Sequence, residues 1–74
     1  GMAPLSPEPG SHEEDLCGSA MQAAILDCAR NGIRSYDEEG VKQCCARACA
    51  MYNVSEYTDH VCRRVIQLMQ ASGM

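Results

Sequence analysis

Six cysteines are the residues of this 74-residue chain best suited to chemistry, and they lie at positions 17, 28, 44, 45, 49 and 62. An even number of cysteines at this density is typical of a small secreted disulfide scaffold. Each bridge in such a domain contributes roughly 2–5 kcal/mol of stability. Zinc is the competing use, but zinc sites favour closely spaced ligand pairs, and neither His12 nor His60 belongs to one. We therefore predict three disulfides, no metal and no cofactor.

The densest sulfur cluster is the stretch 41–49, in which Cys44 and Cys45 are adjacent and Cys49 follows. As a helix, the stretch places its apolar and sulfur positions on one face. A Cys44–Cys49 bridge would join Cα atoms roughly 8 Å apart on a regular helix, whereas disulfides need about 4.4–6.8 Å. A Cys45–Cys49 bridge meets the distance but aims its Cβ vectors poorly. Either all three sulfurs bond to other segments, or the helix unwinds just after Cys45. We favour the second interpretation, in which the doublet ties three segments together.

The remaining polar residues do not suggest catalysis. No serine or cysteine stands at a recognisable spacing from a base, and paired cysteines cannot act as nucleophiles. The acidic run 13–15 is interpreted as the solvated start of a helix, and His60 as a surface histidine. The chain is therefore predicted not to be an enzyme.

Composition and charge restrict the partners further. The net charge is −4 and the pI is about 4.9, whereas nucleic acids and anionic membranes select clustered Lys and Arg. No apolar run approaches the roughly 20 residues of a membrane span. The sequence thus predicts no nucleic-acid partner and no membrane insertion. With no Trp or Phe and only three Tyr, the core must consist of aliphatic side chains, methionine and sulfur.

Three amphipathic segments follow an N-terminal arm. Residues 1–10 hold all three prolines and two glycines, which predicts a disordered arm. The first helix is expected over 12–31, with Ser11 as its N-cap and Asn31-Gly32 as a left-handed stop. Its apolar stripe comprises Leu16, Cys17, Ala20, Met21, Ala24, Ile25 and Cys28.

Two further helices are expected in the second half. Ser35 is the predicted N-cap of the helix that carries the cysteine doublet, and Asn53 that of the last helix, which Ser72-Gly73 ends. The stripe of the last helix comprises Val54, Tyr57 or Thr58, Val61, Cys62, Val65, Leu68 and Met69. Because no such face can be buried alone, the helices must pack together. The predicted fold class is all-α, small and disulfide-rich.

Two stretches resemble the insulin superfamily. Residues 16–19, Leu-Cys-Gly-Ser, an apolar helix, Cys28 and Gly32 are similar to the insulin B-chain. Residues 40–49, with CC-x3-C, followed by Tyr52, Val54 and Tyr57, are similar to the A-chain. The resemblance implies a single domain over 11–74, with a B-like part 11–34, a short linker 35–39, an A-like part 40–62 and a helical extension 63–74.

The resemblance, and not the spacing, implies the disulfides Cys44–Cys49, Cys17–Cys45 and Cys28–Cys62. Two intervals depart from the family pattern. The Cys17–Cys28 interval is one residue shorter than in insulin, and the Cys49–Cys62 interval is four residues longer, close to one helical turn.

The resemblance also implies a function, that of a secreted single-chain hormone or growth factor. Its expected partner is a cell-surface receptor, in particular an insulin-type receptor tyrosine kinase, and a secreted binding protein is a second partner class. Six positions match receptor-contacting positions of insulin: Gln22, Ile33, Gly40, Val41, Gln43 and Tyr57. Gln22, Ile33 and Gly40 depart from the residue types of insulin, which should weaken engagement because large apolar anchors dominate such interfaces.

Other functions remain open from the sequence. A helical disulfide-rich toxin or a ciliate-type pheromone would act on a channel or another receptor. A relaxin-like ligand of a G-protein-coupled receptor would need an Arg-x3-Arg-x2-Ile/Val signature inside the first helix. Arg30 and Arg34 have the spacing but follow Cys28, and position 37 is Asp. A structural or storage domain without a partner is a third class.

Overall fold

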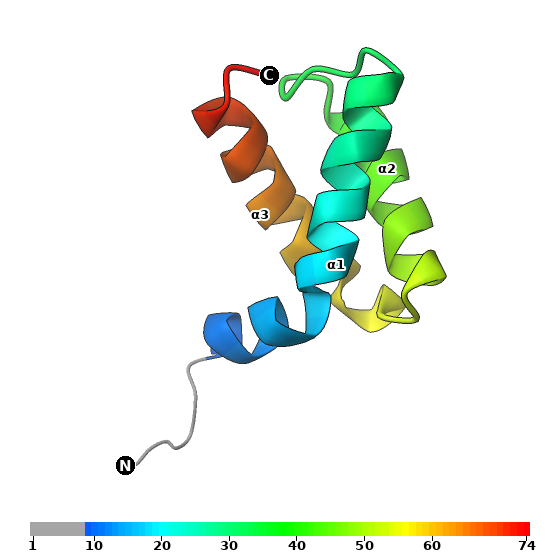
Figure 1. The fold of residues 1–74 in the computed structure, drawn as a ribbon, viewed down its shortest axis with the longest axis vertical. Coiled ribbons are helices and arrows are strands. Elements are labelled where there is room, and N and C mark those ends of the chain that lie inside the picture. Colours follow the sequence, from blue (N-terminus) through cyan, green and yellow to red (C-terminus); the bar gives the residue numbers. More distant parts are fainter. Residues whose placement is uncertain (1–8) are drawn as a thin grey trace.

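The chain folds into three α-helices joined by short turns (Figure 1), in a computed structural model that describes the backbone of residues 9–74 and the side chains from residue 16. The elements are α1 (Pro9–Arg30), α2 (Glu38–Met51), a 3-10 turn η1 (Ser55–Tyr57) and α3 (Thr58–Ala71). No strand occurs among these residues. The predicted all-α class is therefore confirmed.

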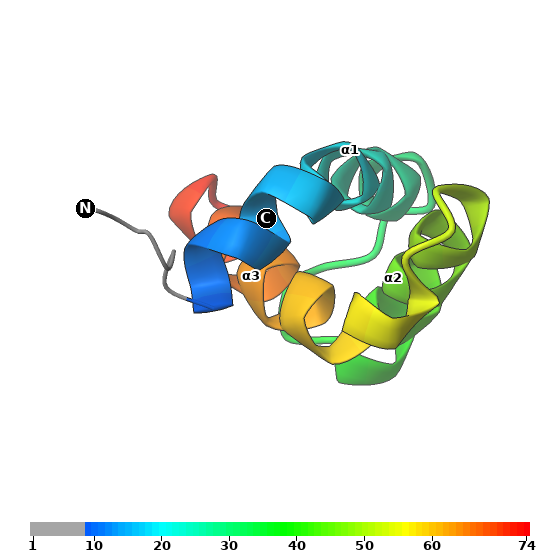
Figure 2. The ribbon, with the colours of Figure 1, turned by 90° about the horizontal axis from the view of Figure 1, so that it is seen from below.

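Each helix packs against the other two, and Figure 2 shows them around a shared interior. Fourteen side chains form this core: Cys17, Ala20, Met21, Ala24, Cys28, Val41, Cys44, Cys45, Ala48, Cys49, Val61, Cys62, Val65 and Met69. All six cysteines belong to it. The predicted stripes are largely confirmed, except that Leu16 is 49% exposed.

The helices begin at residues that the sequence did not indicate. Helix α1 starts at Pro9 and not at residue 12, so Ser11 lies inside the helix and is not its N-cap. At the first position of a helix the fixed φ and missing N–H of proline cost nothing. The predicted arm otherwise lies outside the described residues. Helix α2 starts after Asp37, not Ser35, because the Asp37 carboxylate accepts a hydrogen bond from the Gly40 backbone N–H at 3.1 Å. The Ser35 backbone N–H is instead donated to the Met74 carbonyl.

All three helices end in the same way. The residues that follow them, Gly32, Asn53 and Gly73, have φ of 68°, 60° and 79°. In each case the next N–H bonds back to a carbonyl five residues earlier, in the pairs Ile33–Cys28, Val54–Cys49 and Met74–Met69. This is the Schellman motif, whose apolar residue beyond the left-handed position commonly contacts the helix. Ile33, Val54 and Met74 all pack against the core.

This ending corrects two predictions. Asn53 terminates α2 and does not cap the next helix, which is preceded by the turn η1. Helix α2 also does not unwind after Cys45: it continues to Met51. The physical reason is that its apolar face is continuous through Ala48 and Cys49, both buried, so regular helix buries every one of these side chains at once.

None of the described helices has the length and apolar character required to cross a bilayer.

Candidate functional site

The chemistry-bearing residues converge on the cysteine doublet of α2. Cys44 and Cys45 are both fully buried. Adjacent residues of an α-helix project about 100° apart, so their side chains leave α2 in different directions. Cys44 meets a cysteine of α1, and Cys45 meets a cysteine of α3.

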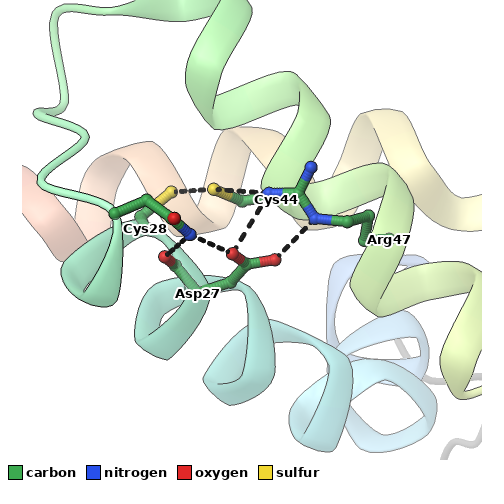
Figure 3. A network of polar contacts seen from close by, with 5 residues as sticks. Asp27, Cys28, Cys44 and Arg47 are labelled. Carbon is green, nitrogen blue, oxygen red and sulfur yellow. Dashed lines mark hydrogen bonds and ion pairs between the residues drawn. The ribbon is translucent and has the colours of Figure 1, made fainter.

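The α1 side of this junction is the pair Cys28 and Cys44. The Cys28 Sγ donates a hydrogen bond to the Cys44 Sγ at 2.6 Å (Figure 3). Burial and the neighbouring Cys44 sulfur raise the pKa of the Cys28 thiol to about 12. A thiol held neutral to that degree is a poor nucleophile at physiological pH.

The α3 side is the pair Cys45 and Cys62, two buried side chains that interact with each other. Burial, followed by this interaction, raises the pKa of the Cys45 thiol strongly. Cys49 is also fully buried, and desolvation raises the pKa of its thiol, an effect that a hydrogen bond with Thr58 partly opposes.

An ion pair lies beside the Cys28–Cys44 contact. Arg47 of α2 donates from Nε to Asp27 Oδ2 at 2.8 Å and from Nη2 to Oδ1 at 3.1 Å. Arg47 Nη2 also lies 3.9 Å from the Cys44 Sγ (Figure 3). The hydrogen bond from Arg47 lowers the pKa of the Asp27 carboxyl, helped by a side-chain bond from Asn31. This bidentate contact joins the surfaces of α1 and α2 beside the buried sulfur pair.

The sequence did not reveal this ion pair. Asp27 and Arg47 are 20 residues apart, and many opposite charges in the chain have comparable separations. Asp27 and Arg47 come together because Cys28 and Cys44, which lie close to them in the sequence, are in contact between α1 and α2.

The six predicted receptor-contacting residues do not form one surface. Ile33 and Gly40 lie together at the end where α1 leads into α2, since a Cβ on Gly40 would be 2.9 Å from Ile33 Cγ2. Tyr57 follows the opposite end of α2 (Figure 1). The 14 residues of α2 separate these ends by about 20 Å.

The exposure of these residues also differs. Gln22 and Gln43 are exposed, whereas Ile33, Gly40 and Tyr57 are half-buried. Val41 is fully buried in the core. No part of the Val41 side chain reaches the surface, so in this structure a receptor could not contact it.

A shallow groove of about 660 Å³ lies between α2 and α3. Its apolar wall is formed by Ala46, Cys62 and Ile66, and charged residues of both signs border it, namely Glu38, Lys42, Asp59 and Arg63. Within the described part of the chain, no three His, Cys, Asp or Glu side chains are arranged to hold a metal ion.

Comparison with known proteins yields no relative. The chain matches no family model, no curated protein and no solved structure at a significant level.

Proposed function

We propose that this chain is a secreted ligand that acts by binding an extracellular target, not by catalysis. The observation that carries the proposal is the burial of six cysteines from three helices in one core, with sulfurs of different helices in contact. Small secreted domains use this arrangement to offset a hydrophobic core that is too small by itself. The helix surfaces are then left for recognition.

An insulin-type receptor is the first target to test. Gln22 and Gln43 are exposed, and Ile33, Gly40 and Tyr57 are half-exposed. Five of the six residues suggested by the resemblance therefore remain able to touch a partner. Two observations weigh against this class. The predicted contacts are divided between opposite ends of the molecule, and the unbroken helix α2 does not favour a Cys44–Cys49 bridge.

The alternative is a helical toxin or pheromone. It is favoured by the continuity of α2, the helix that carries Cys44 and Cys45. A continuous α2 with one sulfur directed at each neighbouring helix produces a rigid three-helix scaffold without the folded-back segment that the insulin resemblance implies. The relaxin-like interpretation gains nothing from the structure. Arg34 lies in the turn after α1, where its Nε donates to the Met74 carbonyl at 2.9 Å.

The experiment begins with binding to intact cells. Oxidised chain labelled at its N-terminus is expected to bind cell surfaces saturably and to be displaced by unlabelled chain. A reduced and alkylated chain is the matched control. Binding that does not saturate on any tested tissue would contradict the proposal.

The target classes are then separated by readout. Receptor phosphorylation in cells that carry an insulin-type receptor supports the hormone class, with Gln43→Ala and Tyr57→Ala as variants that should lower potency. A change in channel current without phosphorylation supports the toxin class.

A further inference from the structure

The orientation of the cysteine doublet determines which bridges this chain can form. Because α2 is regular from Glu38 to Met51, Cys44 and Cys45 cannot both face one neighbouring helix. One neighbour is α1 and the other is α3, and both pack against α2. Each cysteine of the doublet therefore has one helix within reach.

The sulfurs themselves identify the partners. The Cys28 Sγ lies 2.6 Å from the Cys44 Sγ. On the other side of α2, the cysteine that α3 buries is Cys62, and α3 packs against α2. The Asp27–Arg47 ion pair joins α1 and α2 beside the first contact. A Cys44–Cys49 bridge would instead join two positions of one unbroken helix whose Cα atoms are roughly 8 Å apart, beyond the distance that a disulfide spans.

We propose that the oxidised protein contains the disulfides Cys28–Cys44 and Cys45–Cys62, with Cys17 bridged to Cys49. The third pair consists of the two remaining cysteines, both fully buried in the same core. This framework ties α2 to α1 twice and to α3 once. None of these three bridges is among those that the insulin resemblance implies.

The oxidation needs an electron acceptor, which we take to be a small disulfide such as glutathione disulfide. For each bridge, one protein thiolate attacks the acceptor and releases one glutathione, and the partner thiolate then displaces the second. Two protein S–H bonds and the S–S bond of the acceptor are broken. One protein S–S bond and two glutathione S–H bonds form, so the two glutathione thiols carry away the protons and electrons. The pairing rests on the proposed function only in requiring an oxidising compartment. Mapping in a defined redox buffer is independent of any receptor.

The test is peptide mapping of the full chain after folding with reduced and oxidised glutathione. Cleavage after Lys and Arg and before Asp leaves the cysteines in five peptides, 15–26, 27–30, 43–47, 48–58 and 59–63. The doublet stays together in 43–47, and each other cysteine has its own peptide. Non-reducing mass spectrometry then identifies the linked peptides.

We expect 43–47 linked to both 27–30 and 59–63, and 15–26 linked to 48–58. A link between 43–47 and 48–58, or between 27–30 and 59–63, would overturn the proposal, since the insulin-type pairing requires both. Six free thiols after equilibration would overturn it too. Failure of receptor binding with the expected map would leave the pairing intact and contradict only the proposed function.

Two single variants separate the members of the doublet. After oxidation and labelling with N-ethylmaleimide in denaturant, Cys44→Ser should carry the label on 27–30, and Cys45→Ser on 59–63. Label on 59–63 in Cys44→Ser and on 27–30 in Cys45→Ser would pair Cys44 with Cys62 and Cys45 with Cys28, and would overturn the proposal. Label on 48–58 in Cys44→Ser, or on 15–26 in Cys45→Ser, would support the insulin-type pairing instead.

Discussion

Helices α2 and α3 have the same length, 14 residues, but bury different chemistry. The buried face of α2 consists of Val41, Ala48 and three cysteines. That of α3 consists mainly of valine and methionine, with one cysteine. A face of small sulfur side chains contributes less apolar area than one of branched and long side chains. We conclude that α2 depends on its sulfur contacts for its place in the bundle, while α3 is held largely by aliphatic packing.

Reduction should produce the largest effect. If α2 is held by bridges, dithiothreitol should lower the free energy of unfolding of the oxidised chain by about 2–5 kcal/mol for each bridge lost. Chemical denaturation followed by circular dichroism measures this change. Equal stability of the two forms would show that sulfur packing, without covalent bonds, is enough to hold α2.

Truncation of the α3 core comes next. Met69 is fully buried, so Met69→Ala should cost about 2–5 kcal/mol, through lost transfer free energy and the cavity that remains. Leu26→Ala is the control, because Leu26 is 54% exposed. The cost at Met69 should be similar in oxidised and reduced chains. If Met69→Ala lowered the free energy of unfolding only in the reduced chain, α3 would depend on the bridges as α2 does, and the contrast between the two helices would be lost.

The reduced chain should also lose stability at high pH. The pKa of the Cys28 thiol rises from 9.0 to about 12 on folding. Above pH 9 the unfolded chain releases this proton while the folded chain keeps it, so the free energy of unfolding falls as the pH rises from 9 towards 12. The oxidised chain has no thiols to titrate and should lack this fall. Thermal melts of both forms between pH 8 and pH 11 test the difference.

A pair of glycine variants examines the start of α2. Gly40→Ala would place a Cβ 2.7 Å from the Asp37 Oδ2 and disturb the carboxylate that caps the helix, at a cost of about 1 kcal/mol. Gly18→Ala meets nothing within 4 Å in α1 and should stabilise the chain by up to about 1 kcal/mol. If Gly40→Ala stabilised the chain as well, the Asp37 carboxylate would not require glycine in the first turn of α2.

The smallest effect is expected at the ion pair between α1 and α2. Arg47 lowers the pKa of Asp27, so the pair stabilises the fold above the pKa of the unfolded carboxyl and loses that contribution as the pH falls through the lower folded value. Asp27→Asn should therefore lower the melting temperature slightly at pH 7 and not at pH 2. Because Arg47 is half-exposed, added salt should reduce the difference. Glu56→Gln is the control, because Glu56 is an exposed acidic residue that takes no part in the Asp27–Arg47 pair.

The helices and their buried faces could be predicted from residue spacing, and the details of their boundaries could not. Ala20, Ala24 and Cys28 recur at helical intervals and are buried, and both Gly32 and Gly73 take the left-handed conformation expected of a helix stop. Ser35, Asp37 and Asn53 each satisfy the composition of a cap. The choice among them depended on contacts with distant residues, such as that of Ser35 with Met74.

By itself, the sequence determined that three helices would share one sulfur-rich core, because a period of 3.6 residues assigns each side chain to a face of its own helix. Only the tertiary structure decided that Cys44 meets Cys28 and Cys45 meets Cys62. The reason is that a partner depends on the register and rotation of one helix against another. Those two quantities arise from the packing of the whole core, and no spacing along a single helix encodes them.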